Sequence, residues 1–346
     1  MTSKRKSGKK KKVIIIVTVF FSLLLVGLIS AYALFKHYAG MLNYEPMVSE
    51  DIVDIEPEDT DFDEDSPYGD IEDAKAKIDE NLEADMDELP YKDDVFNVLL
   101  IGSDERSPSS RGRSDTMMII SINKRTKQIV MSSLLRDTYI SIPKGIGYSR
   151  LNAAYAYGGP SLLMETIKQN FGIPIDKYMQ VGFDAFTSIV DVISGVRVTL
   201  RSDEVDYINK RLDSGSKKLE GSGGDYLLNG TQALIYARIR YLDSDFGRTE
   251  RQRSIITSVI GKARKMSIPE LNEFLKVLLP QITTNLTESE LLSFVLSSVS
   301  YLDYDLVSFT MPMKGSWSDL IVNGMMVLSV DFSANRSALI KTIYGE

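Results

Sequence analysis

The stretch Val95-Phe96-Asn97-Val98-Leu99-Leu100-Ile101-Gly102 is almost wholly apolar and ends at a glycine. A run of this length and composition predicts a β-strand that is buried on both faces. Similar runs follow at 117–122, 128–134, 178–183 and 196–200. Helical patterns alternate with them, at 161–171, 186–193, 230–237 and 249–264. This alternation predicts the α/β class: a layered α-β-α domain with a mixed central sheet, whose core covers residues 95–265.

The remainder of the chain, 266–346, is expected to complete this domain with helices and a strand. Thr287-Glu288-Ser289-Glu290 has the pattern of a capping box, in which the first and last side chains satisfy each other's backbone N–H groups. The apolar segment 291–302 behind it is predicted to be helical, and 306–311 to be a late strand.

The composition excludes several kinds of active site. The chain has 346 residues, no cysteine and a single histidine, His37, which precedes the predicted domain. A Ser-His-Asp triad, a cysteine nucleophile and a zinc site of histidine or cysteine are therefore excluded in that domain. Arginines and carboxylates remain, and these residue types hold phosphate oxygens and Mg²⁺ respectively.

The net charge of −8 is unevenly distributed, because the N-terminus is basic. Lysines and an arginine crowd residues 1–12, and 13–35 then contains no charged residue. This pattern predicts a basic cytoplasmic tail, a single transmembrane helix at 13–35 and an extracellular remainder at the cell membrane. A signal peptide cleaved near Ala31-Tyr32-Ala33 is the alternative, although the apolar run is longer than usual for one. A basic arm that binds nucleic acid is disfavoured so close to a span, where lipid headgroups are the natural partner.

Two segments connect the predicted span to the domain. Residues 36–74 include a strongly acidic stretch and are expected to form an extracellular linker. Residues 75–94 are expected to hold an accessory helix, because Ile78, Leu82 and Met86 recur at four-residue spacing. This helix is predicted to pack on the domain that follows.

Polar residues gather where the first strands of the domain end. Asp104 and Asp115 lie on either side of one loop and could share a cation, although their spacing alone favours an ordinary polar loop. Arg136 and Asp137 directly follow an apolar strand, a position that often faces a crevice in open α/β sheets. An internal salt bridge between them is an equally good interpretation.

Two further arginine groups occur later in the chain. Arg238 and Arg240 can share a face only if that segment is extended, because side chains alternate along a strand. Arg248, Arg251 and Gln252 share a face if a helix begins near residue 248, and that helix N-terminus would favour an anion. The alternative for this last group is a solvated basic surface.

Together these segments resemble the LytR–CpsA–Psr family of bacterial cell-envelope phosphotransferases. The resemblance covers roughly residues 95–265 in order, together with the short tail and the single anchor. The matching stretches are Arg113-Ser114-Asp115-Thr116, Leu135-Arg136-Asp137 with Ile142-Pro143, Leu151-Asn152-Ala153-Ala154-Tyr155 with Gly158-Gly159, Val190-Asp191, Leu228-Asn229-Gly230 with Gln232-Ala233-Leu234, Tyr236-Ala237-Arg238-Ile239-Arg240, and Asp245-Phe246 with Arg248 and Arg251-Gln252.

The resemblance implies a reaction and a set of site residues. Such proteins transfer a phosphate-linked glycopolymer, such as teichoic acid or capsule, from a polyprenyl-pyrophosphate carrier to peptidoglycan, with Mg²⁺. By motif position Asp104 and Asp115 would bind the metal. Arg136 and Asp137 are the candidate catalytic residues, and Asp137 is a possible base because a nearby carboxylate could take the proton of the acceptor hydroxyl. The residues expected around the pyrophosphate are Arg113, Arg136, Arg238, Arg240, Arg248 and Gln252.

The resemblance also implies an apolar groove for the lipid tail, and the candidate lining residues are Val181, Phe183, Phe186 and Ile189. Two departures from the family pattern stand out: Arg150 occupies a position that is usually lysine, and the variable stretch 241–244 leaves the role of Asp245 open. A lipid-linked glycan-binding scaffold without turnover is the main alternative function. A transcriptional or envelope-stress regulator is disfavoured, because only the short basic tail would lie in the cytoplasm.

Overall fold

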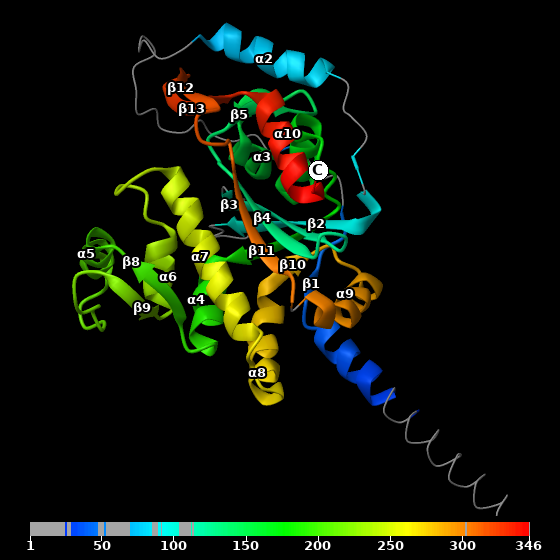
Figure 1. The fold of residues 1–346 in the computed structure, drawn as a ribbon, viewed down its shortest axis with the longest axis vertical. Coiled ribbons are helices and arrows are strands. Elements are labelled where there is room, and N and C mark those ends of the chain that lie inside the picture. Colours follow the sequence, from blue (N-terminus) through cyan, green and yellow to red (C-terminus); the bar gives the residue numbers. More distant parts are fainter. Residues whose placement is uncertain are drawn as a thin grey trace, which may run out of the picture.

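The computed structural model describes residues 25, 29–47, 52, 70–84, 89–90, 92–103, 112, 114–301 and 303–345. A mixed sheet of seven strands forms its centre (Figure 1). From one edge to the other the strands are β1 (Asn43–Tyr44), β10 (Ile282–Thr284), β7 (Lys177–Gly182), β2 (Val95–Ser103), β3 (Ser114–Asn123), β4 (Gln128–Leu134) and β11 (Asp305–Met311). The pairs β1–β10, β2–β7 and β4–β11 are parallel and the other neighbours are antiparallel, which confirms the predicted mixed sheet.

Helices cover one face of the sheet with a closely packed core. The covering helices are α2 (Ile71–Glu83), α3 (Leu151–Phe171) and α10 (Phe332–Tyr344). Leu99 and Ile119 from the strands and Ile167 from α3 have no solvent exposure. Helix α2 confirms the predicted accessory helix, although it begins at Ile71, where the Asp70 side chain accepts hydrogen bonds from the backbone N–H groups of Glu72 and Asp73.

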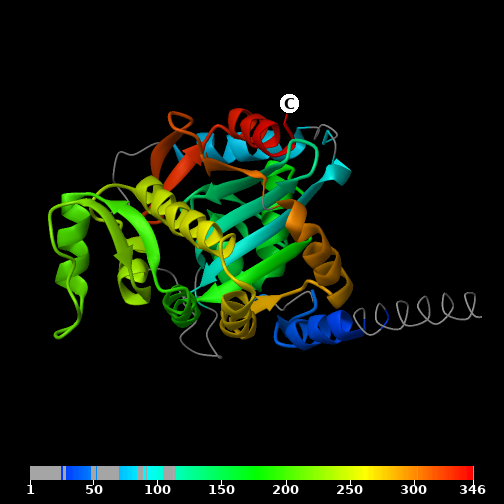
Figure 2. The same cartoon turned by 60° about the horizontal axis from the view of Figure 1, so that its bottom comes forward.

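A second helical layer lies on the opposite face of the sheet (Figure 2). It consists of α4 (Phe183–Val192), α6 (Gly230–Ala237), α7 (Asp245–Ala263) and α8 (Ile268–Leu278). These helices share a separate apolar core with α5 (Ser202–Arg211) and with the hairpin of β8 (Val196–Leu200) and β9 (Gly224–Leu228). The domain therefore has the predicted α-β-α layers, with an outlying hairpin beside the second helical layer.

Two more hairpins lie near the end of β4. They are β5 (Tyr139–Ile142) with β6 (Gly147–Arg150), and β12 (Trp317–Val322) with β13 (Met325–Val330). A bridge between Thr138 and Leu328 connects them. The remaining elements are the short helices η1 (Lys92–Asp94) and η2 (Leu279–Gln281) and helix α9 (Glu288–Tyr301). The predicted capping box begins α9: the backbone N–H of Thr287 donates to Glu290 over 2.9 Å.

The segment before α2 differs in part from the predicted linker over 36–74. Residues 29–39 are helical, and strand β1 pairs with β10. Lys36 forms an ion pair with Glu288 of α9, and the Tyr38 hydroxyl donates to Asn272 of α8. The acidic composition starts only near residue 50, so residues 36–47 still carry aromatic and aliphatic side chains that can dock on the domain.

Among the residues that the structure describes, no helix combines the length and the apolar character needed to cross a bilayer. The predicted basic tail and most of the predicted span at 13–35 lie outside those residues. The same holds for Asp104 and Arg113.

Candidate anion site at the mouth of an apolar cavity

An apolar cavity of about 610 Å³ separates the central sheet from the second helical layer. Leu100 and Val181 line it from the sheet. The helices contribute further apolar side chains: Phe183, Phe186, Ile189, Leu234, Ile235, Ile255, Ile256, Val259, Ile260 and Leu278. All four residues that we expected in an apolar groove, Val181, Phe183, Phe186 and Ile189, are among them. The cavity is open to solvent and can therefore admit a long apolar chain.

Charged side chains from separate parts of the sequence meet along the same cavity. Five of the predicted site residues line it: Arg136, Arg238, Arg240, Arg248 and Gln252. Asp115, a predicted metal ligand, lines it as well. The fold therefore brings together every predicted pyrophosphate residue that the structure describes.

Arg136 sits between three carboxylates. Its Nη1 donates to Asp115 Oδ1 over 2.9 Å, and its Nε lies 3.5 Å from both Asp137 Oδ2 and Asp245 Oδ2. Its side chain is 13% exposed. Burial lowers the pKa of the Arg136 guanidinium, but Asp137, Asp245 and Asp115 together outweigh burial and raise it. Arg136 thus stays charged at the cavity mouth. The predicted Arg136–Asp137 salt bridge is present as well.

Asp245, the first residue of α7, connects three of the arginines. Its carboxylate lies 2.9 Å from Arg248 Nη2 and 3.5 Å from the Nε atoms of both Arg136 and Arg240. Burial raises the pKa of Asp245, and Arg248 is the strongest opposing influence. The sequence placed Asp245 in a matching motif but gave it no role, because this network joins segments that are far apart in the chain.

Arg248 has a buried charge that is only partly compensated. Its side chain is 4% exposed, and its Nε atom has no hydrogen-bond partner among the described residues. Burial is the main reason why the pKa of its guanidinium is lowered, although Asp245 raises it. An incompletely paired buried cation costs free energy unless an anion joins it. The site therefore favours a negatively charged ligand at this position.

Arg238 and Arg240 flank the fully buried Ile239 just after α6 ends. Both arginines line the cavity, although the expected extended backbone is absent at Arg238, which lies in a turn with φ −103° and ψ 2°. The Arg238 guanidinium lies 4.4 Å from the centre of the Phe183 ring. Within the described residues it has no carboxylate partner. Arg238 therefore adds positive charge that the aspartates do not neutralise.

Helix α7 places Arg248, Arg251 and Gln252 within about 100° of arc, as expected, but Arg251 does not line the cavity. Arg251 is 3% exposed, and its Nε donates to Glu204 over 2.7 Å while its Nη2 donates to Asp243 over 2.5 Å. At about 100° of rotation per residue, Arg251 lies about 100° from Gln252 around the helix and turns away from the cavity. Arg251 holds α7 against α5 instead of binding a ligand.

Asp115 is the one predicted metal ligand in the described part of the chain. Its side chain is 27% exposed, and one of its oxygens already accepts from Arg136. No group of three or more acidic or histidine side chains there could hold a metal ion by itself. Magnesium usually takes one or two carboxylates together with phosphate oxygens and water, so the oxygen donors here suit a metal that arrives with a phosphate ligand.

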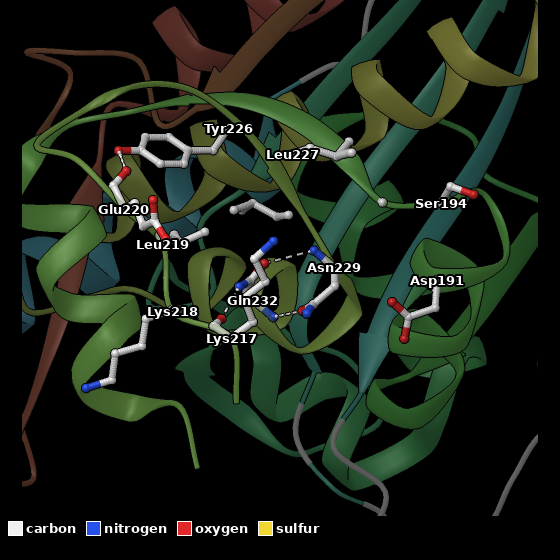
Figure 3. A pocket seen from close by; sticks show the side chains of 12 residues that line it. Asp191, Ser194, Lys217, Lys218, Leu219, Glu220, Tyr226, Leu227, Asn229 and Gln232 are labelled. Carbon is white, nitrogen blue, oxygen red and sulfur yellow. Dashed lines mark hydrogen bonds between the residues drawn. The ribbon is translucent and has the colours of Figure 1, made fainter. Parts of the chain in front are cut away.

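A separate pocket of about 540 Å³ lies at the start of α6 (Figure 3). Its polar groups already serve the backbone: Asn229 accepts from the N–H of Gln232, Gln232 donates to the carbonyl of Lys217, and Asp191 accepts from the N–H of Gly230. These hydrogen bonds stabilise the beginning of α6, and we assign no ligand to this pocket.

Comparison with known proteins finds relatives that agree with the family resemblance seen in the sequence. Polyisoprenyl-teichoic acid–peptidoglycan teichoic acid transferase TagT of Bacillus subtilis (strain 168) is 34% identical over 199 residues, which are 56% of this chain and 61% of that protein. The corresponding transferase TagU of the same strain is 32% identical over 213 residues, covering 61% of this chain and 66% of TagU. The chain thus spans less than two thirds of either relative.

The fold has counterparts among solved structures. TagT with bound octaprenyl pyrophosphate lipid superposes with a TM-score of 0.57 at 25% identity, over 76% of this chain and 95% of that one. Finally, the model of the LytR_cpsA_psr family matches residues 65–340, which include the whole central sheet apart from β1. The chain therefore belongs to the LytR_cpsA_psr family.

Proposed function

We propose that this protein transfers a phosphate-linked glycopolymer from a polyprenyl-pyrophosphate carrier to a hydroxyl group of peptidoglycan. The observation that carries the proposal is the partly unpaired arginine cluster at the mouth of the apolar cavity. A polyprenyl pyrophosphate has the matching chemistry, with a long apolar chain joined to a diphosphate. The relatives named above are teichoic acid transferases, and one related structure holds a polyprenyl pyrophosphate.

The cavity would hold the prenyl chain, with its first units against Phe183 and Val181. Burial of apolar lipid surface favours binding by about 25 cal/mol per Å². The diphosphate would then lie beside Arg136, Arg240 and Arg248. Arginine suits this place because its guanidinium stays ionised next to lipid and its fork binds two phosphate oxygens at once.

The reaction requires one bond to form and one to break. The acceptor hydroxyl oxygen attacks the phosphorus that carries the glycan, and the bond from this phosphorus to the bridging oxygen breaks. Polyprenyl phosphate leaves with the bonding electron pair, and its charge is stabilised by Arg136 and Arg248. The hydroxyl proton passes to a carboxylate, for which Asp137 and Asp245 are the candidates. Positioning and charge stabilisation are the main demands of phosphoryl transfer, and the arginine cluster suits both.

Mg²⁺ is part of this proposal. Asp115, together with Asp104 and phosphate oxygens, would hold the ion. When bound, Mg²⁺ would neutralise charge on the two phosphates. The proposed location is the outer face of the cell membrane, with the N-terminal segment as a single-pass anchor, in accord with the charge asymmetry around residues 13–35.

The proposal is tested by turnover. The purified protein is incubated with Mg²⁺, a short prenyl-pyrophosphate-linked sugar and a peptidoglycan oligomer, and both prenyl phosphate and the coupled product are measured. Arg136→Ala is expected to lower the rate by about 100-fold or more, the usual effect of removing a transition-state charge partner. The matched control is Arg197→Ala, because Arg197 is an exposed arginine of β8, away from the cavity.

Coupled product from the parent and from Arg197→Ala, but not from Arg136→Ala, would support the transferase. Binding of the prenyl-pyrophosphate sugar without any coupled product would instead favour the glycan-binding scaffold.

A further inference from the structure

A second cleft, of about 680 Å³, opens from the same arginines as the apolar cavity. Arg136, Arg240 and Tyr241 line both spaces, so the two meet where the diphosphate is expected. The second cleft lies between the start of α7 and the β12–β13 hairpin. Its lining is more acidic than that of the apolar cavity, since it carries three carboxylates where the cavity carries only that of Asp115.

An aromatic pair forms part of this cleft. Phe246 of α7 and Trp317 of β12 stack with ring centres 5.5 Å apart and planes 25° from parallel. Both side chains are only partly buried. The Trp317 indole Nε1 has no hydrogen-bond partner among the described residues, although it is buried. Because the two rings stack on each other, the parts of each ring that stay exposed form an apolar surface against which the C–H groups of a sugar can pack. A buried indole N–H usually has an acceptor.

The polar lining offers both donors and acceptors. Asp137, Asp245 and Asp319 supply carboxylate oxygens, and Ser244 supplies a hydroxyl group. Arg150 holds the rim of the cleft in place, because its Nη2 donates to the carbonyl of Met326 in β13 over 2.9 Å. The three carboxylates are balanced by Arg136, Arg150 and Arg240 in the same lining, so the cleft presents donors and acceptors without a clear excess of either charge. Such a lining suits a neutral polyol, whose hydroxyl groups donate and accept. This balance favours a saccharide as the ligand.

We propose that this cleft is a saccharide subsite and that it holds the sugar carrying the acceptor hydroxyl. The inference rests on the proposed function. With the prenyl chain in the apolar cavity, the leaving oxygen points towards that cavity. An in-line attack then requires the acceptor oxygen to approach from the side away from the prenyl chain. The second cleft meets the apolar cavity at Arg136, Arg240 and Tyr241 and would supply the space for this approach. The sugar would lie against the exposed edges of Phe246 and Trp317.

The test uses a convenient property of the chain: Trp317 is its only tryptophan. Tryptophan emission therefore reports on this cleft alone. The protein is titrated with three probes: a peptidoglycan disaccharide-peptide, a short prenyl-pyrophosphate-linked sugar, and farnesyl pyrophosphate without a sugar. Saturable change of the emission by the disaccharide-peptide is expected, together with little change by farnesyl pyrophosphate.

The three probes separate the sources of the saccharide. A response to the disaccharide-peptide assigns the cleft to the acceptor, and a response to the prenyl-pyrophosphate sugar alone assigns it to the glycan of the donor. No response to either sugar, or an equal response to farnesyl pyrophosphate, would overturn the subsite. The affinity for farnesyl pyrophosphate is measured in parallel by calorimetry. If farnesyl pyrophosphate does not bind either, the proposed diphosphate site is wrong, and not only the saccharide subsite.

A pair of variants distinguishes saccharide binding by the aromatic stack from a purely structural role. Trp317→Leu keeps an apolar side chain against the core and is expected to weaken disaccharide-peptide binding about tenfold, measured by calorimetry. Tyr226→Leu is the control, because Tyr226 lines the separate pocket of Figure 3. Unchanged saccharide affinity in Trp317→Leu, with a thermal unfolding temperature like that of Tyr226→Leu, would contradict the proposal.

Discussion

The two faces of the central sheet are built from similar residues but have opposite roles. On one face, Leu99 and Ile119 of the sheet pack with Ile167 of α3, and none of the three is exposed to solvent. On the other face, Val181 and Phe186 remain partly exposed around a cavity of about 610 Å³. Filled space stabilises a fold, whereas an open apolar cavity forgoes packing contacts. The difference separates the face that holds the domain together from the face at which we propose that a ligand binds.

The largest expected effect concerns two arginines of α7 that differ in role. Arg251 pairs with Glu204, whose side chain is 4% exposed. Arg251→Met removes the buried partner of that carboxylate and leaves it only Arg201, whose Nη1 lies 3.5 Å away, so the free energy of unfolding is expected to fall by about 3 kcal/mol. Arg248→Met serves as the matched variant and should weaken pyrophosphate binding with little loss of stability. Urea unfolding of both variants measures the contrast, and equal destabilisation would remove the distinction between the two arginines.

The next prediction compares isoleucines from the two faces. Ile167→Ala creates a cavity in the filled core and is expected to cost about 2–5 kcal/mol in the free energy of unfolding. Ile256 lines the open cavity and is partly exposed, so Ile256→Ala should cost only about 1 kcal/mol. Ile256→Ala should still weaken the binding of a prenyl pyrophosphate. If urea unfolding gives equal losses for the two variants, the second face is as well packed as the first.

A smaller effect is expected at the mouth of the cavity. A carboxamide is a poorer ligand than a carboxylate for a hard cation, so Asp115→Asn should need roughly tenfold more Mg²⁺ for half-maximal transfer. The control is Asp319→Asn, in the second cleft, which should leave the Mg²⁺ requirement unchanged. An Asp115→Asn rate that follows Mg²⁺ concentration like the parent rate would show that Asp115 only orients Arg136.

Local sequence patterns were sufficient to predict the strands that form the closely packed face of the sheet. Runs of apolar residues located β2, β3 and β4 to within three residues at each end, and the capping box located the start of α9. Helix α3 was predicted only from residue 161, because Gly158, Gly159 and Pro160 resemble a break. The structure has this break as a kink, since Gly158 and Gly159 leave the helical conformation, with a φ of +61° at Gly159. The prediction missed the helical residues before the kink, and a Cβ on Gly158 would lie 2.6 Å from Leu162. Glycine allows both the kink and the close approach.

The face of the sheet that borders the apolar cavity was harder to predict, because its site depends on contacts between segments that are far apart in the sequence. The sequence identified Arg136, Arg238, Arg240, Arg248 and Gln252 through their family motifs, and the structure places them around one cavity. Asp245 was left without a role and the Phe246–Trp317 stack was not foreseen. Each of these joins the start of α7 to a segment about 70–110 residues away in sequence. Hydrophobic periodicity carries no information on such pairings, since it reports only local structure.

The smallest predicted effect is a pH response of the anion site. Burial raises the pKa of Asp245, so this carboxylate takes up a proton at a higher pH than an ordinary aspartate. Protonation removes a negative charge beside Arg136, Arg240 and Arg248, while a diphosphate that links a prenyl chain to a sugar keeps its charge. Affinity for such a ligand should therefore rise as the pH falls from 7 towards the pKa of Asp245.

The size of this response should be up to about fivefold, which is typical of a partly solvated ion pair. Asp245→Asn should bind the ligand more tightly than the parent at pH 7 and should lose the pH response, because an asparagine has no proton to gain. Calorimetry of a short prenyl-pyrophosphate sugar between pH 7 and pH 5 measures both effects. A variant that keeps the parent's pH response would mean that a different group titrates. The preference of the site for anions would then come from the arginines alone, and protonation of Asp245 would not change it.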